Sequence, residues 1–81
     1  MIQMSFEKIS AVNLIEVLQN GVVQVRTELA IMEDGVKISS NFHRSVILPG
    51  ANFDNEDARV KAICAVVHTP EVVAQYTQSL E

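Results

Sequence analysis

The stretch LQNGVVQVRTELAIMEDGVKIS, residues 18–39, decides the fold because it holds two strong hairpin signals close together. Asn20-Gly21 and Asp34-Gly35 are residue pairs that tolerate the positive φ angles of a type I′ turn. Hydrophobic residues alternate with polar ones around each pair, which is typical of strands in a sheet with one buried face. The pattern predicts three strands joined by two tight turns, over about residues 6–19, 22–33 and 36–48.

Two-residue turns would also fix how the strands pair. Leu18 would lie opposite Val23 across the first turn. Ile31 would lie opposite Ile38 across the second. In these registers most large hydrophobic residues share one side of the sheet, whereas a turn longer by one residue would invert a whole strand. The agreement favours a three-stranded antiparallel meander whose core side is formed by Leu14, Leu18, Val23, Val25, Leu29, Ile31, Val36, Ile38, Phe42, Val46 and Leu48.

The rest of the chain predicts a first helix. Pro49-Gly50 ends the third strand, because proline cannot continue the hydrogen-bond ladder. Asp54 or Asn55 is expected to be the N-cap. Glu56 and Asp57 would lie in the first turn, where negative charge complements the helix dipole. The apolar positions that recur at helical spacing are Val60, Ile63, Cys64 and Val67.

A second, short helix is expected after a break at Pro70, because the residue before a proline avoids the helical conformation. Thr69 would be its N-cap. Its apolar stripe would consist of Val72, Val73, Tyr76 and Leu80. The chain is thus predicted to be a single α+β domain, residues 1–81, with a three-stranded antiparallel meander over residues 6–48 and one or two C-terminal helices, over residues 54–80, packed on one face of the sheet.

Two helices cover only one side of such a sheet. On the other side the second and third strands are polar. The first strand is apolar on both of its faces, and such a strand is usually buried. Either the N-terminal segment or a loop folds over this strip, or another chain covers it. The remaining alternative is that the first strand is bulged and contributes both of its faces to one core. We expect a protein interface at Ile9, Ala11, Ile15 and Val17, together with Arg26 and His43 of the polar face.

Composition and charge exclude several classes of function. The net charge is −4 and the six Lys and Arg residues are scattered, whereas a nucleic-acid-binding protein concentrates positive charge on one surface. No secretory signal is apparent at the N-terminus, and no apolar run approaches the roughly 20 residues that span a bilayer. The single cysteine excludes an intrachain disulfide. We therefore expect synthesis in a cytoplasm and no nucleic-acid or membrane partner.

No catalytic or metal-binding motif is apparent. Cys64 and His68 are four residues apart and could share a helix face, but zinc needs three or four ligands. His43 and Asp54 do not stand at a matching spacing, and nothing supplies an orienting group for a Cys-His nucleophile. We expect a buried core cysteine, no metal, no cofactor and no enzymatic activity.

The charged pair His43-Arg44 has two interpretations. On the predicted register Arg44 could reach Glu16 across the middle strand and form a structural ion pair. Alternatively, Arg26 and Arg44 could together bind a carboxylate or phosphate, although strand alternation in that register places them on opposite faces. The register therefore favours the structural interpretation.

Three ordered motifs carry a family resemblance: VRTELAIMEDG (residues 25–35), SNFHRSVILPG (residues 40–50) and RVKAICAVVHTPEVVAQY (residues 59–76). The chain resembles a family of small proteins of tailed bacteriophages and prophages that are encoded among virion genes, often near the tail genes. The resemblance implies a structural or assembly role and a location in the virion. It brings no catalytic residues, since the matched positions are mostly turns, breaks and caps.

The expected function is accordingly that of a non-enzymatic structural or virion-assembly protein, associated with a phage tail and acting through protein–protein contacts. Its partners would be further copies of itself or other virion proteins. The alternative is a small regulatory or inhibitor module that binds a host or phage protein through its acidic surface.

Overall fold

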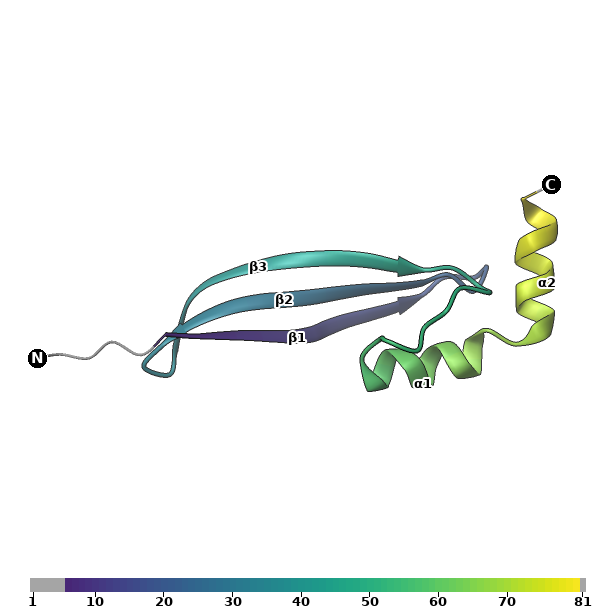
Figure 1. Ribbon diagram of the computed structural model, residues 1–81. Coiled ribbons are helices and arrows are strands. Elements are labelled where there is room, and N and C mark those ends of the chain that lie inside the picture. Colours follow the sequence, from purple (N-terminus) through teal and green to yellow (C-terminus); the bar gives the residue numbers. More distant parts are fainter. Residues whose placement is uncertain (1–5, 81) are drawn as a thin grey trace, which may run out of the picture.

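The computed structural model describes residues 6–80 and contains an antiparallel sheet in the order β1-β2-β3, followed by two helices (Figure 1). This confirms the predicted α+β fold and the meander. The elements are β1 (Phe6–Val17), β2 (Val23–Glu33), β3 (Val36–Ile47), α1 (Ala58–Val67) and α2 (Pro70–Ser79).

The connection between β1 and β2 is one residue longer than predicted. Leu18 N–H donates to Val22 O at 2.9 Å, and Gly21 N–H donates to Leu18 O at 2.9 Å. Gly21 has φ +92°, so the chain turns through a three-residue loop that ends in a left-handed glycine. Val17 therefore pairs with Val23. The predicted pairing of Leu18 with Val23 is wrong, because the Asn20 side chain accepts from Val22 N–H at 3.1 Å and stabilises the wider loop.

A β-bulge then divides β1 into two halves. Val12 pairs with Thr27 and Leu14 pairs with Arg26, so that Asn13 is an additional residue without a direct partner. The carbonyl oxygen of Val12 accepts a hydrogen bond from Arg59 Nη2 of α1 at 2.7 Å, which ties the helix to the bulge. The predicted bulge of the first strand is therefore present, but Ile9 and Ala11 beyond it are exposed, so β1 does not contribute both of its faces to one core.

The turn between β2 and β3 has the predicted length. Asp34 and Gly35 have φ of 49° and 82°, as a type I′ turn requires, and Glu33 pairs with Val36. A second bulge follows, because Met32 pairs with Lys37 but Ile31 pairs with Ser39. The extra residue, Ile38, inverts the rest of β3 relative to the prediction.

The two bulges and the longer loop decide which residues face the helices. The side of the sheet that α1 covers, the helix face, carries Val12 and Ile15 of β1, Val23 and Val25 of β2, and Ile47 of β3. The opposite side, the reverse face, carries the side chains in register with Arg26. The predicted assignment of Leu14, Phe42 and Val46 to the core side is therefore wrong.

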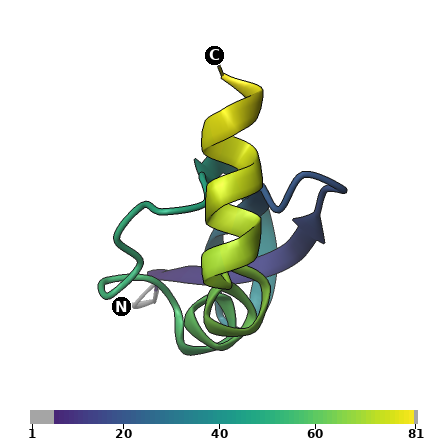
Figure 2. The same ribbon diagram turned by 90° about the vertical axis from the view of Figure 1, so that its right-hand side faces the viewer.

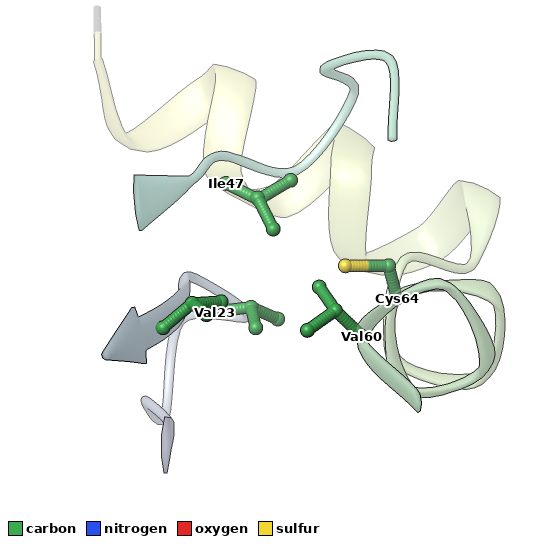
Figure 3. Close-up of a cluster of buried hydrophobic side chains, with 5 residues drawn as sticks. Val23, Ile47, Val60 and Cys64 are labelled. Carbon is green, nitrogen blue, oxygen red and sulfur yellow. The ribbon is translucent and has the colours of Figure 1, made fainter. Parts of the chain in front are cut away.

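The core is small and lies at one end of the sheet. Val23, Val60 and Cys64 are completely buried, and Val25 and Ile47 complete the cluster (Figure 3). Phe53 and Ile63 pack against it. The predicted apolar stripe of the first helix is confirmed, since Val60 and Cys64 are buried and Ile63 and Val67 are half-buried.

The first helix begins later than predicted, with Asp57 as its N-cap. The Asp57 carboxylate accepts from Arg59 N–H at 2.9 Å. The expected caps Asp54 and Asn55 lie in the preceding turn, in which Asn52 Oδ1 accepts from Asp54 N–H at 2.7 Å. This turn directs Phe53 toward the core and delays the helix. In α2 the predicted cap is confirmed, because Thr69 Oγ1 accepts from Val72 N–H at 3.2 Å.

The two helices occupy different places. The first, α1, lies on one face near the end of the sheet, whereas α2 stands across that end (Figures 1 and 2). Gly21 lies close to Val72 and Pro49, so the start of α2 rests on the β1–β2 loop. The molecule measures 63 × 19 × 15 Å and has a radius of gyration of 17.2 Å. A compact chain of this length has a radius of gyration of about 12 Å.

Candidate interaction surface

Most of the length of the sheet extends away from the helices (Figure 1). We call this part the distal arm and define it as residues 6–11, 28–33 and 36–42, which pair with one another across the sheet. None of these residues belongs to the buried core cluster. Ala30 is the one described residue of the distal arm that is buried. Strand pairing, and not packing against the helices, therefore holds the distal arm together.

Large hydrophobic side chains are exposed on both faces of the distal arm. On the helix face, Leu29 and Val36 are 47% and 62% exposed. On the reverse face, Ile9 and Phe42 are 44% and 51% exposed. A part of the surface on which several large apolar side chains are exposed is a candidate protein–protein contact site.

The six predicted interface residues do not form one patch, because the bulge at Asn13 separates them. Three of them lie on the reverse face: Ile9, Ala11 and Arg26. The other three lie on the helix face: Ile15, Val17 and His43. Ile15 is half-buried against the core, while Val17 and His43 are exposed. The prediction that Ile15 and Val17 face away from the core is wrong.

Arg26 and Arg44 are direct cross-strand partners on the reverse face, so their predicted placement on opposite faces is wrong. They line a recess of about 260 Å³ together with Leu14, Glu16, Gln24 and Val46. Within residues 6–80, the predicted ion pair between Arg44 and Glu16 does not form. His43 pairs with Thr27 and not with Arg26.

The Arg26 side chain is held in place by two neighbours. Its Nε donates to Asn13 Oδ1 at 3.0 Å, and its Cζ lies 4.5 Å from the centroid of the Phe42 ring. The first contact depends on the bulge, which brings Asn13 beside β2. The second is a cation–π contact that follows from the shifted register of β3. Neither neighbour could be assigned to Arg26 from alternation alone.

An ion pair lies on the reverse face of the distal arm. Lys37 Nζ lies 2.8 Å from Glu28 Oε2. The hydrogen bond from Lys37 lowers the pKa of the Glu28 carboxyl below its ordinary value of 4.5, and the charges of Lys37 and Arg26 act in the same direction.

Cys64 and His68 do not form a shared site. Cys64 is completely buried, and burial, together with the Glu56 carboxylate, raises the pKa of its thiol. The His68 ring lies against the β1–β2 loop, with Nε2 at 2.7 Å from Gly21 O. Over residues 6–80 no group of three His, Cys, Asp or Glu side chains is arranged to hold a metal ion. Among the described residues, neither helix is long and apolar enough to cross a membrane.

Comparisons with known proteins give no further assignment. No family model matches the chain, and no similar curated protein or solved structure was found.

Proposed function

We propose that this protein is a non-enzymatic assembly subunit that associates with further copies of itself through the distal arm. The observation that carries the proposal is the exposure of Ile9, Leu29 and Phe42 on both faces of a sheet that the helices leave uncovered. Large apolar side chains that are exposed on both sides of a sheet add to its stability when another chain buries them.

The size of the exposed surface supports an obligate association. The chain exposes 6043 Å², which is about 1,200 Å² more than the surface of a compact monomer of its mass. Interfaces of permanent complexes bury on the order of 1,000 Å² or more per partner. The excess is therefore of the size that one such interface would remove.

The edges of the sheet offer a second mode of contact. The outer sides of β1 and β3 have no neighbouring strand among the described residues. Their backbone N–H and C=O groups are free to pair with a strand of another chain, which is the mechanism of β-augmentation.

The setting that we propose for this association is the virion of a tailed bacteriophage, in or near the tail. The support for this setting is the resemblance of the motifs over residues 25–35, 40–50 and 59–76. Mass spectrometry of purified particles tests it: a structural subunit is present in the particle, whereas a regulatory module or inhibitor is absent from it.

Sedimentation velocity across a concentration series tests the association itself. The wild-type protein is expected to form oligomers, and Ile9→Ser and Leu29→Ser are expected to shift the equilibrium toward the monomer. The matched control is Val66→Ser, because Val66 is 76% exposed but lies on α1, outside the distal arm. A wild-type protein that stays monomeric at high concentration, or equal effects of all three substitutions, would contradict the proposal.

A further inference from the structure

The recess on the reverse face carries an unbalanced positive charge. Two guanidinium groups, of Arg26 and Arg44, and one carboxylate, of Glu16, line it. Like charges directly opposite each other on neighbouring strands destabilise a sheet. One additional carboxylate would neutralise the recess and lie between the two arginines.

The guanidinium N–H groups of Arg26 and Arg44 are available to bind a carboxylate. Asn13 and Phe42 hold Arg26 through its Nε atom and one face of its guanidinium, which leaves the two terminal nitrogens available. Arg44 is exposed and forms no ion pair within residues 6–80. A planar carboxylate matches the paired N–H groups of a guanidinium, and a side chain that is already held in place loses less entropy on binding.

The surroundings of the recess favour a carboxylate that belongs to a protein. Leu14 and Val46 supply apolar walls that the neighbouring part of a protein partner can bury. A phosphate dianion is disfavoured, because Glu16 repels a second negative charge. A nucleic-acid backbone is disfavoured, because the six Lys and Arg residues are scattered along the sequence.

We infer that this recess binds the carboxylate of an Asp or Glu side chain from a second copy of the chain. The inference rests on the proposed self-association and adds a contact beside the distal arm, since the residues that line the recess lie outside residues 6–11, 28–33 and 36–42. The second copy is a suitable source, because the chain has ten acidic residues and six basic ones. Among the acidic residues in the described part, Glu28 and Asp57 are the ones paired with a basic residue of the same chain.

Charge reversal tests the contact. Arg44→Glu is expected to weaken self-association by on the order of 10-fold or more in Kd, because it replaces a charge-assisted pair with a repulsion. The matched control is Lys61→Glu, which makes the same change of charge at an exposed position of α1 and is expected to leave Kd within about twofold. Circular dichroism of each variant establishes that the sheet is retained.

Cross-linking identifies the carboxylate. Arg44→Lys keeps the positive charge and introduces an amine that a carbodiimide can join to a carboxylate in direct contact with it. Mass spectrometry of mixed light and heavy isotope-labelled protein is expected to show one dominant intermolecular cross-link from position 44 to an Asp or Glu residue. Arg44→Gln, which has no reactive amine, is the control and should give no cross-link at this position.

The outcomes separate this inference from the proposed function. An oligomer that is weakened by Ile9→Ser but unaffected by Arg44→Glu, with no intermolecular cross-link from position 44, overturns the carboxylate contact and leaves self-association standing. A strictly monomeric wild-type protein overturns both.

Discussion

The imidazole of His68 joins the α1–α2 junction to the loop at Gly21, with Nε2 at 2.7 Å from the Gly21 carbonyl oxygen. Because a carbonyl oxygen only accepts, Nε2 must carry the hydrogen of the ring. Nδ1 is buried and has no hydrogen-bond partner within residues 6–80. The ring also contacts Phe53 edge-on, at 6.2 Å between centroids. His68 therefore fixes the position of α2 across the end of the sheet.

We predict that His68→Phe destabilises the fold although it retains an aromatic ring. The Gly21 carbonyl loses its donor, and an unsatisfied buried acceptor costs about 1–3 kcal/mol. His68→Gln can place an N–H donor near the same carbonyl and should cost less. Urea unfolding of the three proteins measures the difference, and equal midpoints for the two variants would show that the hydrogen bond contributes nothing.

We predict that Gly21→Ala is more damaging than Gly35→Ala. Both glycines have positive φ, +92° and +82°, so an alanine at either position is strained by about 1–2 kcal/mol. Nothing lies within 4 Å of a Cβ at Gly35, whereas a Cβ at Gly21 would overlap Val72 Cγ1 and lie 3.3 Å from Pro49 Cγ. This crowding should add about 1–3 kcal/mol to the loss of unfolding free energy.

A double variant tests the origin of that difference. If crowding by Val72 is the cause, Val72→Ala should offset part of the cost of Gly21→Ala, so that the two changes are not additive. Strict additivity in the same unfolding experiment would assign the cost to the backbone alone.

We predict that Asp57→Ala reduces the stability by about 1 kcal/mol, because it removes the N-cap of α1. Asp54→Ala should have a smaller effect, since the Asp54 side chain caps no helix and its backbone N–H keeps its bond to Asn52. Chemical denaturation monitored by circular dichroism measures both. A larger effect at Asp54 would contradict the observed start of the helix.

We predict that the ion pair of Glu28 with Lys37 stabilises the protein at neutral pH and not in acid. The folded-state pKa of Glu28 is lowered from 4.5, so the unfolded chain takes up the proton first as the pH falls. The contribution is fully present above about pH 4.5 and is lost as the pH falls through the folded-state pKa. The melting temperatures of wild type and Lys37→Met should therefore differ at pH 7 and converge in acid.

NMR titration of Glu28 provides an independent check of this pair. The carboxyl of the wild-type protein should titrate below pH 4.5, and in Lys37→Met the midpoint should move back toward that value. A midpoint that Lys37→Met leaves in place would mean that Lys37 is not the cause of the lowered pKa.

The elements of the fold could be predicted from local signals, but the faces of the strands could not. Asp34 and Gly35 form the predicted type I′ turn, and Thr69 caps α2 as its sequence position indicates. The length of a loop and the position of a bulge could not be predicted in this way. Each depends on the backbone conformation of a single residue, which the alternation of polar and apolar residues does not encode. Asn20 is compatible with loops of two or three residues, and its bond to Val22 N–H accompanies the longer one.

One signal for the first bulge is present in the sequence. Val12 and Ile15 both pack against the core although they are three residues apart, which is an odd spacing for one face of a strand. A bulge between them reconciles this spacing with a single buried face. At Ile38 no comparable break is apparent, since the polar residues that follow it fit either register. The recess of Arg26 and Arg44 depends on that second bulge and could not be predicted for this reason.

The confinement of the core to one end of the sheet has a consequence for hydrogen exchange. Amide protons of β2 near Val23 and Val25 lie beside the buried cluster and should exchange only when the whole molecule unfolds. Those of residues 28–33 belong to the same strand but have strand pairing alone to protect them, so they should exchange by local opening. Assembly would slow the exchange of this segment most, and the amides that gain protection with concentration would trace the surface that another chain covers.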